Sequence, residues 1–207
     1  MRNGWWKKGV FVLLMLGVVG GVFFCARTAG MQNAVAEGVL RLHIVANSDS
    51  DYDQSVKLKV RNRILADCGY LFQDCRTAEE SALVAKRHSR EIQKAAEAEL
   101  RKYGVLQPVS VRVEETRFPT KEYGAVRLPA GAYTALNVRI GTAQGRNWWC
   151  VLYPPLCLTG DAVKADEETL KQLRQTLTAE EYALVTQTDE IQVHVKFKLL
   201  ELLGKWF

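Results

Sequence analysis

The pattern of apolar and polar positions predicts that strands and helices both contribute to this chain. Residues 37–46 alternate as in a half-buried strand, with Leu40, Leu42 and Ile44 on one face. Residues 51–68 have apolar positions at helical spacing behind a polar, acidic start, although the alternation VKLKVRNRI would also suit a strand. We therefore expect a strand that passes into a helix.

A longer helix is predicted from the capping box formed by Thr77 and Glu80. The segment AEESALVAKRHSREIQKAAEAELRKYG keeps one apolar face and reaches a helix stop at Gly104. Three strands are then predicted, in PVSVRVEETRF, in AYTALNVRIG and in the aromatic stretch AQGRNWWCVLYPPLC. The turn-rich segment PTKEYGAVRLPAG between the first two is predicted to be a connecting loop.

The C-terminal part begins with a polar helical stretch over residues 161–186, with a second capping box at Thr178 and Glu181. The chain ends in EIQVHVKFKLLELLGKWF, which predicts a strand followed by a short apolar helix. This order of elements favours an α+β fold over a regular βαβ alternation. We predict one domain over residues 37–207, with a mostly antiparallel sheet and several packed helices.

The N-terminal segment MRNGWWKKGVFVLLMLGVVGGVFFCARTAG predicts export. Lys7 and Lys8 precede an uncharged apolar run of 18 residues, Gly9–Ala26, and basic residues before such a run keep its start in the cytoplasm. The run is longer than most signal-peptide cores and short for a membrane span. Residues 1–36 are therefore either a signal peptide or a signal anchor.

The candidate cleavage points do not decide between these two readings. Ala34-Val35-Ala36 has the small-x-small pattern of a signal-peptidase site, but it lies far downstream of the apolar run. Cleavage after Ala29 would put Arg27 at the −3 position, where a small residue is expected. Membrane attachment through this segment is expected if it is not cut.

The charge of the chain argues against nucleic-acid binding. The formal net charge of +5 comes mainly from residues 1–36, which hold four basic residues and no acid. The remaining residues carry 24 basic and 23 acidic side chains. Nucleic-acid binders concentrate Lys and Arg on one face, and this near-neutral domain gives no such footprint.

Three carboxylates at alternate positions, Asp49, Asp51 and Asp53, suggest a calcium loop. An EF-hand loop needs Gly at its sixth position and Glu at its twelfth, and these positions are Gln54 and Val60. We predict instead that the acids cap the helix and complement its dipole. No metal or other cofactor is expected.

An enzymatic alternative would be a secreted hydrolase, with a peptide or cell-wall substrate, that uses His43 and His194 with an Asp. Both histidines fall in predicted strands and could approach each other in a sheet. The sequence contains no His-Glu-x-x-His helix, no Gly-x-Ser-x-Gly elbow and no phosphate-binding glycine loop. We therefore expect a protein that is not an enzyme.

Four cysteines follow the leader in two equally spaced pairs: Cys68, Cys75, Cys150 and Cys157. Outside the cytoplasm a disulfide can form among them, and three connectivities are open. Free, partly buried thiols are the alternative. A zinc site would need Cys-x-x-Cys knuckles or nearby histidines, which this spacing lacks.

Adjacent aromatic residues supply a different kind of signal. Side chains alternate along a strand, so Trp148 and Trp149 should lie on opposite faces of the sheet. One can join the core, whereas the other would face solvent unless something covers it. An exposed Trp beside the rigid turn at Pro154 and Pro155 is typical of an interface anchor.

Three blocks of this sequence resemble the stage II sporulation protein R family of endospore-forming bacteria. They are LRLHIVANSDSDYDQSVKLKVRNRIL, RFPTKEYGAVRLPAGAYTALNVRIG and NWWCVLYPPLC, in the family's order behind a hydrophobic leader. The resemblance covers most of residues 37–158, and the tail, residues 159–207, is less similar.

The resemblance implies a protein made in the forespore and exported into the space between the forespore and mother-cell membranes. There it would activate a membrane-embedded aspartic protease of the mother cell, which processes the precursor of sigma-E. The resemblance thus implies an intercellular signal. We expect its partner-binding residues within the matching blocks: Asn47, Asp49, Asp53, Trp148, Trp149, Pro154 and Pro155.

Overall fold

A computed structural model of the chain describes residues 5–155 and 167–186. The helices are α1 (Trp5–Glu37), α2 (Asp51–Cys68), the 3-10 helix η1 (Gly69–Phe72), α3 (Ala78–Arg87), α4 (Ser89–Lys102), α5 (Glu167–Thr176) and α6 (Ala179–Thr186). The strands are β1 (Leu40–Val45), β2 (Val109–Phe118), β3 (Lys121–Tyr123), β4 (Val126–Leu128), β5 (Gly131–Ile140) and β6 (Asn147–Tyr153).

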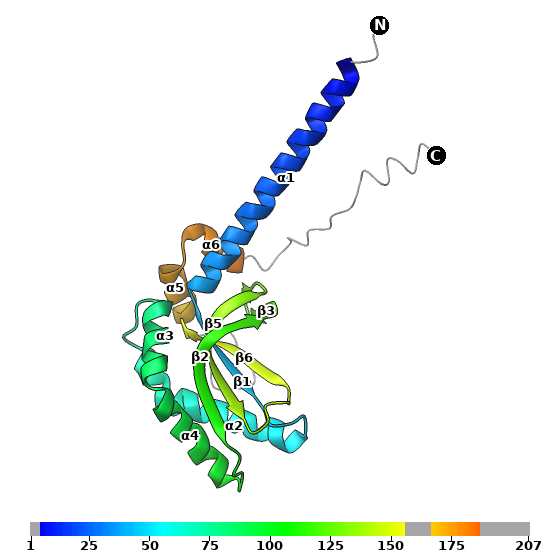
Figure 1. Cartoon of the computed structure of the whole chain (residues 1–207). Coiled ribbons are helices and arrows are strands. Elements are labelled where there is room, and N and C mark those ends of the chain that lie inside the picture. Colours follow the sequence, from blue (N-terminus) through cyan, green and yellow to red (C-terminus); the bar gives the residue numbers. More distant parts are fainter. Residues whose placement is uncertain (1–4, 156–166, 187–207) are drawn as a thin grey trace.

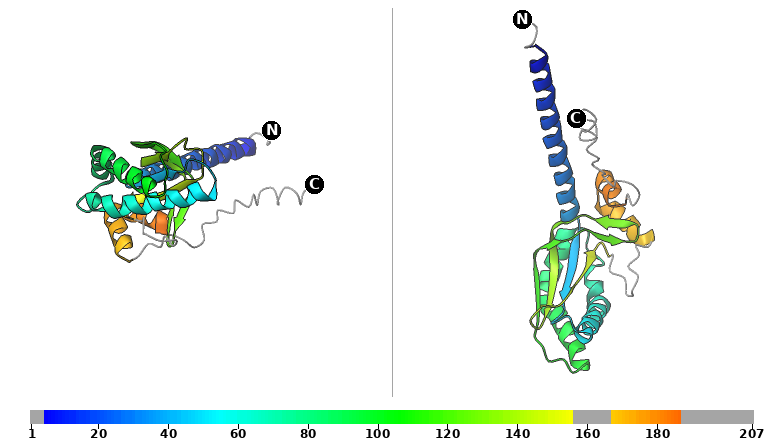
Figure 2. Two further views of the ribbon diagram at one scale, coloured as in Figure 1. Left: turned by 90° about the horizontal axis from the view of Figure 1, so that it is seen from below. Right: turned by 90° about the vertical axis from the view of Figure 1, so that its right-hand side faces the viewer.

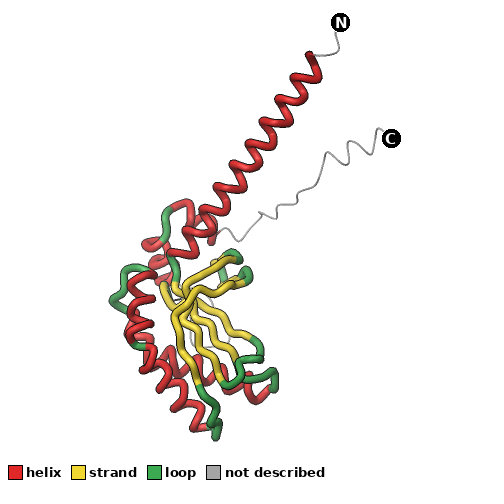
Figure 3. Tube along the Cα trace, in the orientation of Figure 1, coloured by secondary structure: helices red, strands yellow, loops and turns green. Residues whose placement is uncertain are grey.

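The central feature is a mixed four-stranded sheet in the order β2-β5-β1-β6, shown as arrows in Figure 1 and in yellow in Figure 3. β1 runs parallel to β5, whereas the β2–β5 and β1–β6 pairs are antiparallel. β3 and β4 form a separate two-stranded hairpin. The predicted α+β class with a mostly antiparallel sheet is confirmed.

One face of the sheet packs against α2, α3 and α4, and we call it the helix face (Figure 2). Leu40, Leu42 and Ile44 of β1 point to this face and are fully buried. Val60 and Ile64 contribute from α2. The period-2 pattern of β1 and the helical pattern of α2 thus meet in one core, and burial of these side chains is the main driving force for the fold.

The opposite face, which we call the second face, carries the alternate residues of the same strands. The β2–β5 ribbon curves over this face, as its bent arrows in Figure 1 show. Thr116 pairs with Tyr133 in the ladder, yet its hydroxyl lies 2.7 Å from the side-chain nitrogen of Asn137, four residues further along β5. Such a contact requires a strongly bent ribbon, and the bend encloses part of the second face.

The predicted leader is one continuous helix, α1, that projects away from the domain in Figure 1. Its segment Lys8–Glu37 is long and apolar enough to cross a membrane, and a signal sequence would pass the same test. The last turn differs from the rest of the helix, because Val35 is fully buried in the core and Ala36 is nearly so.

Two predicted segments differ from the structure. The expected loop between the long strands contains the hairpin β3–β4, because Gly124 takes a positive φ of 62° and supplies the tight turn. The expected long helix is broken at His88, whose ψ of 12° ends α3 before α4 begins. The predicted caps at Thr77 and Thr178 are present. The predicted C-terminal strand and helix lie outside the described residues.

Candidate functional site

The loop after β1 is joined to the loop between β5 and β6 through Asn47. The amide nitrogen of Asn47 donates to Asp53 Oδ2 at 2.9 Å. Its side-chain oxygen accepts from the backbone N–H of Thr142 at 3.0 Å, and its backbone oxygen accepts from Gln144 at 3.2 Å. Asn47 therefore uses its polar atoms to hold two loops together.

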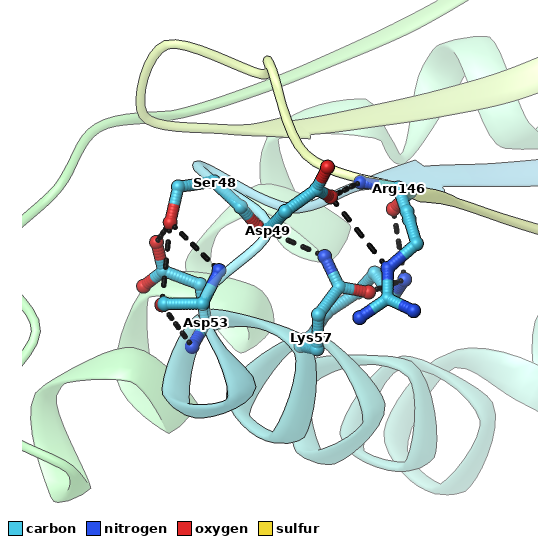
Figure 4. Close-up of polar contacts among 7 residues, drawn as sticks. Ser48, Asp49, Asp53, Lys57 and Arg146 are labelled. Carbon is cyan, nitrogen blue, oxygen red and sulfur yellow. Dashed lines mark hydrogen bonds and ion pairs between the residues drawn. The ribbon is translucent and has the colours of Figure 1, made fainter.

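Asp53 fixes the start of α2 from within the first turn (Figure 4). Its carboxylate accepts from the hydroxyl of Ser48 at 2.6 Å and from Asn47. These hydrogen bonds, first from Ser48 and then from Asn47, hold the pKa of Asp53 below its ordinary value. Ser50 caps the helix by accepting from the backbone N–H of Asp53 at 3.1 Å.

Asp49 and Lys57 bind the loop before β6 at the same residue, Arg146 (Figure 4). Asp49 Oδ1 accepts from the backbone N–H of Arg146 at 2.6 Å and lies 3.7 Å from its guanidinium. The buried ammonium of Lys57 donates to the backbone oxygen of Arg146 at 2.8 Å and to Gln54 Oε1 at 2.6 Å. Burial, with Arg146 nearby, lowers the pKa of Lys57 to about 8.

Glycine is required where these two loops touch. A Cβ on Gly145 would lie 2.6 Å from the backbone carbon of Ser48, so a larger residue would push the loops apart. Gly141 has a positive φ of 58°, and a Cβ there would lie 2.9 Å from Cγ of Asn47. The predicted contact residues Asn47, Asp49 and Asp53 thus form a tightly packed junction, and only Asp49 among them is exposed.

A metal is not favoured at this junction. Asn47 and Ser48 already donate to the carboxylate of Asp53, and the backbone of Arg146 donates to that of Asp49. Among residues 5–155 and 167–186 no group of three or more His, Cys, Asp or Glu side chains is placed to hold a metal ion.

A chain of hydrogen bonds crosses the second face of the sheet. Asn137 of β5 is buried; its nitrogen donates to Thr116 of β2, and its Oδ1 lies 2.6 Å from Nδ1 of His43 on β1. Nε2 of His43 lies 2.8 Å from Oδ1 of Asn147 on β6. Both ring nitrogens of His43 therefore face amide oxygens. His194, the second histidine of the hydrolase alternative, lies outside the described residues.

The two adjacent tryptophans lie on opposite faces, as the alternation predicts. Trp148 is on the helix face, where the guanidinium of Arg61 sits 4.3 Å from its ring centroid. Trp149 is on the second face, stacked beside His43 at 6.2 Å, with the ammonium of Lys121 at 4.6 Å. Both indoles are half-buried. Helix α2 therefore covers Trp148, whereas Trp149 borders a surface that α2, α3 and α4 leave uncovered.

A buried arginine beside Trp149 was not predicted from the sequence. Arg41 is fully buried, and its guanidinium lies 4.3 Å from the ring centroid of Phe118 and 5.0 Å from that of Tyr133. It donates to the hydroxyl of Tyr123 at 2.7 Å and to the backbone oxygen of Cys150 at 3.0 Å. Burial lowers the pKa of Arg41. The only sequence signal is its basic side chain within strand β1, whose other residues are apolar apart from His43.

Two hollows lie beside these residues. One, of about 510 Å³, is on the second face and is bordered by His43, Asn147 and Arg139 together with the loop between β5 and β6. The other, of about 430 Å³, lies between η1 and α5 and is bordered by the predicted contact residues Pro154 and Pro155. The predicted contact residues therefore occupy four separate places rather than one continuous surface: the loop junction, Trp148 on the helix face, Trp149 on the second face, and the hollow beside Pro154 and Pro155.

The cysteines divide into bonded and free. Cys150 is disulfide-bonded, whereas Cys157 lies outside the described residues. Cys68 and Cys75, which we considered for a bridge, are free thiols. The thiol of Cys68 points into the core, and Cys75 follows η1 with its sulfur 3.8 Å from the backbone oxygen of Leu71. Burial raises the pKa of Cys68 to about 11.

Comparison with known proteins identifies the family. The family model described as stage II sporulation protein R matches residues 36–164. The stage II sporulation protein R of Bacillus subtilis (strain 168) is 35% identical over 186 residues, which span 84% of this chain and 83% of that protein. No solved structure matches. The matched range includes the junction of the two loops, the second face and both tryptophans, and the chain belongs to the stage II sporulation protein R family.

Proposed function

We propose that this protein is an exported signal of endospore formation that activates a membrane-embedded aspartic protease, which then processes the sigma-E precursor in the mother cell. The observation that carries the proposal is family membership over the folded domain, behind an N-terminal helix that suits export. The partner, the location between the two membranes and the processed substrate are those that the family resemblance implies.

We assign the partner-binding role to the surface around Trp149. Trp149 is a large aromatic side chain on the second face, beside the hollow bordered by His43 and Asn147. Tryptophan is enriched among the residues that contribute most of the binding energy at interfaces. The loop junction around Asn47 contributes by holding the neighbouring strands β1, β5 and β6 in place.

Activation by binding sets a thermodynamic condition. A ligand shifts the protease toward its active conformation only if it binds that conformation more tightly than the inactive one. The interface must therefore contact a part of the protease that differs between the two states. A residue that supplies such a contact should change activation without changing the stability of the signal protein.

The test is co-production of the full chain, exported, with the protease and its precursor substrate in a host that does not sporulate. Processing of the precursor is read by immunoblot. We expect processing only when all three are present. Uncut precursor in the presence of exported, folded signal protein and intact protease would refute the proposal.

Two variants refine this test. Trp149→Ala should lower processing about 30-fold or more, as the loss of an interface centre worth about 2 kcal/mol would. Leu83→Ala removes an apolar side chain that is 60% exposed on α3, and it should leave processing unchanged. Circular dichroism of both variants shows whether each is folded.

A further inference from the structure

α1 changes its surroundings abruptly along its length. Its large apolar side chains from Val10 to Phe24 are all between 43% and 71% exposed. Its last turn is inside the domain, because Val35 is completely buried with Val39 and Leu40 of the following segment. One continuous helix thus has an uncovered apolar part and a part that belongs to the folded core.

The uncovered part fits a bilayer in both length and composition. The 18 uncharged residues Gly9–Ala26 extend about 27 Å as a helix, close to the hydrocarbon thickness of about 30 Å. They are apolar on all sides, as a membrane span is, rather than on one stripe. Basic residues, Lys8 and Arg27, stand at the two ends of this run.

The C-terminal part of α1 packs against the domain without a linker. Arg27, the first residue after the apolar run, pairs with Glu180 of α6 at 3.3 Å. Gly38 comes directly after the helix, and it is so closely packed that a Cβ at this position would lie 2.7 Å from Leu177 Cδ2. α1 also contacts β5. Although the exposed ion pair contributes little stability by itself, it shows that α6 lies beside the end of the span.

The two candidate cleavage points are both unfavourable. Cleavage after Ala36 would remove Val35 and Ala36 from the core and leave a cavity. Cleavage after Ala29 would spare the core, but Arg27 occupies its −3 position.

We propose that α1 is a retained membrane anchor and that its last turn is a structural part of the domain. The domain is then held rigidly on the outer surface of the membrane of the cell that makes it. About eight residues, or 12 Å of helix, separate Arg27 from Val35, so the core begins close to the lipid headgroups. This inference is independent of the proposed function.

The first experiment measures whether the segment stays attached. The full chain with a C-terminal tag is exported in a bacterial host, fractionated with alkaline carbonate and weighed by intact-mass spectrometry. We expect the mass of the complete chain in the membrane pellet. The variant Arg27→Ala places alanine at −3 and −1 of cleavage after Ala29, and it should yield a shortened, released product. A wild-type chain that is itself shortened or released would overturn the proposal.

The second experiment tests the packing of the last turn and uses no protease readout. Urea unfolding of the full chain in detergent micelles is followed by circular dichroism. Val35→Ala should lower the unfolding midpoint by about 1 M, because it removes buried methyl groups. Val22→Ala makes the same change at a position that is 64% exposed in the apolar run and should leave the midpoint unchanged. Equal midpoints for the two variants would show that α1 ends outside the core.

Discussion

Lys57 provides a direct test of how the loop junction is held. Its ammonium is buried beneath the loop that carries Arg146 and donates to two oxygens at 2.6 and 2.8 Å. The dominant electrostatic effect is nevertheless the cost of burying the charge, which lowers its pKa from 10.5 to about 8. The variant Lys57→Met removes this charge and keeps much of the apolar stem.

The sign of the pH dependence follows from these two pKa values. Between pH 8 and 10.5 the unfolded chain holds a proton on Lys57 that the folded protein does not, so the free energy of unfolding rises with pH. Below pH 8 both states are protonated and the full cost is present. The pKa difference corresponds to about 3 kcal/mol, and we expect about half of it because Arg146 and Asp49 beside Lys57 are exposed to water.

The measured quantity is the difference in the free energy of unfolding between the wild type and Lys57→Met. Urea unfolding of the full chain in detergent micelles gives this difference at pH values from 7 to 10. Burial raises the pKa of Cys68 to about 11 and that of Tyr133 to about 12, so both groups make the free energy of unfolding fall at alkaline pH. Both groups are present in the wild type and in Lys57→Met, so their effects cancel in the difference. The pH-independent cost of two lost hydrogen bonds also cancels in the slope.

We expect the wild type to gain about 1.5 kcal/mol relative to Lys57→Met across this pH range. Lys59→Met is the matched control, because Lys59 is an exposed lysine of the same helix and its removal should leave a constant difference. A difference for Lys57→Met that stays constant or falls with pH would refute the assignment of Lys57 as a buried, destabilised cation.

Three further predictions concern the packing of the domain. Gly145→Ala should lower the free energy of unfolding by about 2–3 kcal/mol in urea titrations, because its Cβ would press on the backbone of Ser48. Native-state alkylation at pH 8, read by peptide mass spectrometry, should modify half-exposed Cys75 at least ~100-fold faster than buried Cys68, and equal rates would contradict the burial of the Cys68 thiol. Thr77→Ala should cost about 1 kcal/mol in the same urea titrations, since it removes the hydroxyl that caps α3.

The sequence predicted correctly those features that depend on neighbouring residues along the chain. The alternation of Leu40, Leu42 and Ile44 indicated the inward face of β1, and the capping box of Thr77 and Glu80 indicated the start of α3. These predictions succeed because strand faces and helix caps depend on residues within one turn or one strand.

The features that could not be predicted depend on contacts between segments that are far apart in the sequence. Arg41 is surrounded by side chains from β2, the β3–β4 hairpin and β5, which only the curvature of the long ribbon brings together. Asn47 and Gly145 are 98 residues apart, yet they belong to one junction. The sequence indicated Asp49 and Asp53 as notable but not that their carboxylates bind neighbouring backbone and hydroxyl groups.

β1 connects the two parts of the molecule that the proposals concern. α1 enters β1 at Leu40, and the loop junction begins after Val45, so the six-residue strand separates the two by about 17–20 Å (Figure 1). With α1 held in a membrane as we propose, the junction lies on the side away from that membrane. Its loops are linked by hydrogen bonds through Asn47 and Asp49, so little conformational entropy remains to be lost when a partner binds there or beside it. With α1 fixed in the membrane and the loop junction held by hydrogen bonds, Trp149 would be presented in a fixed orientation. A ligand that discriminates between two conformations of its partner requires such a fixed orientation.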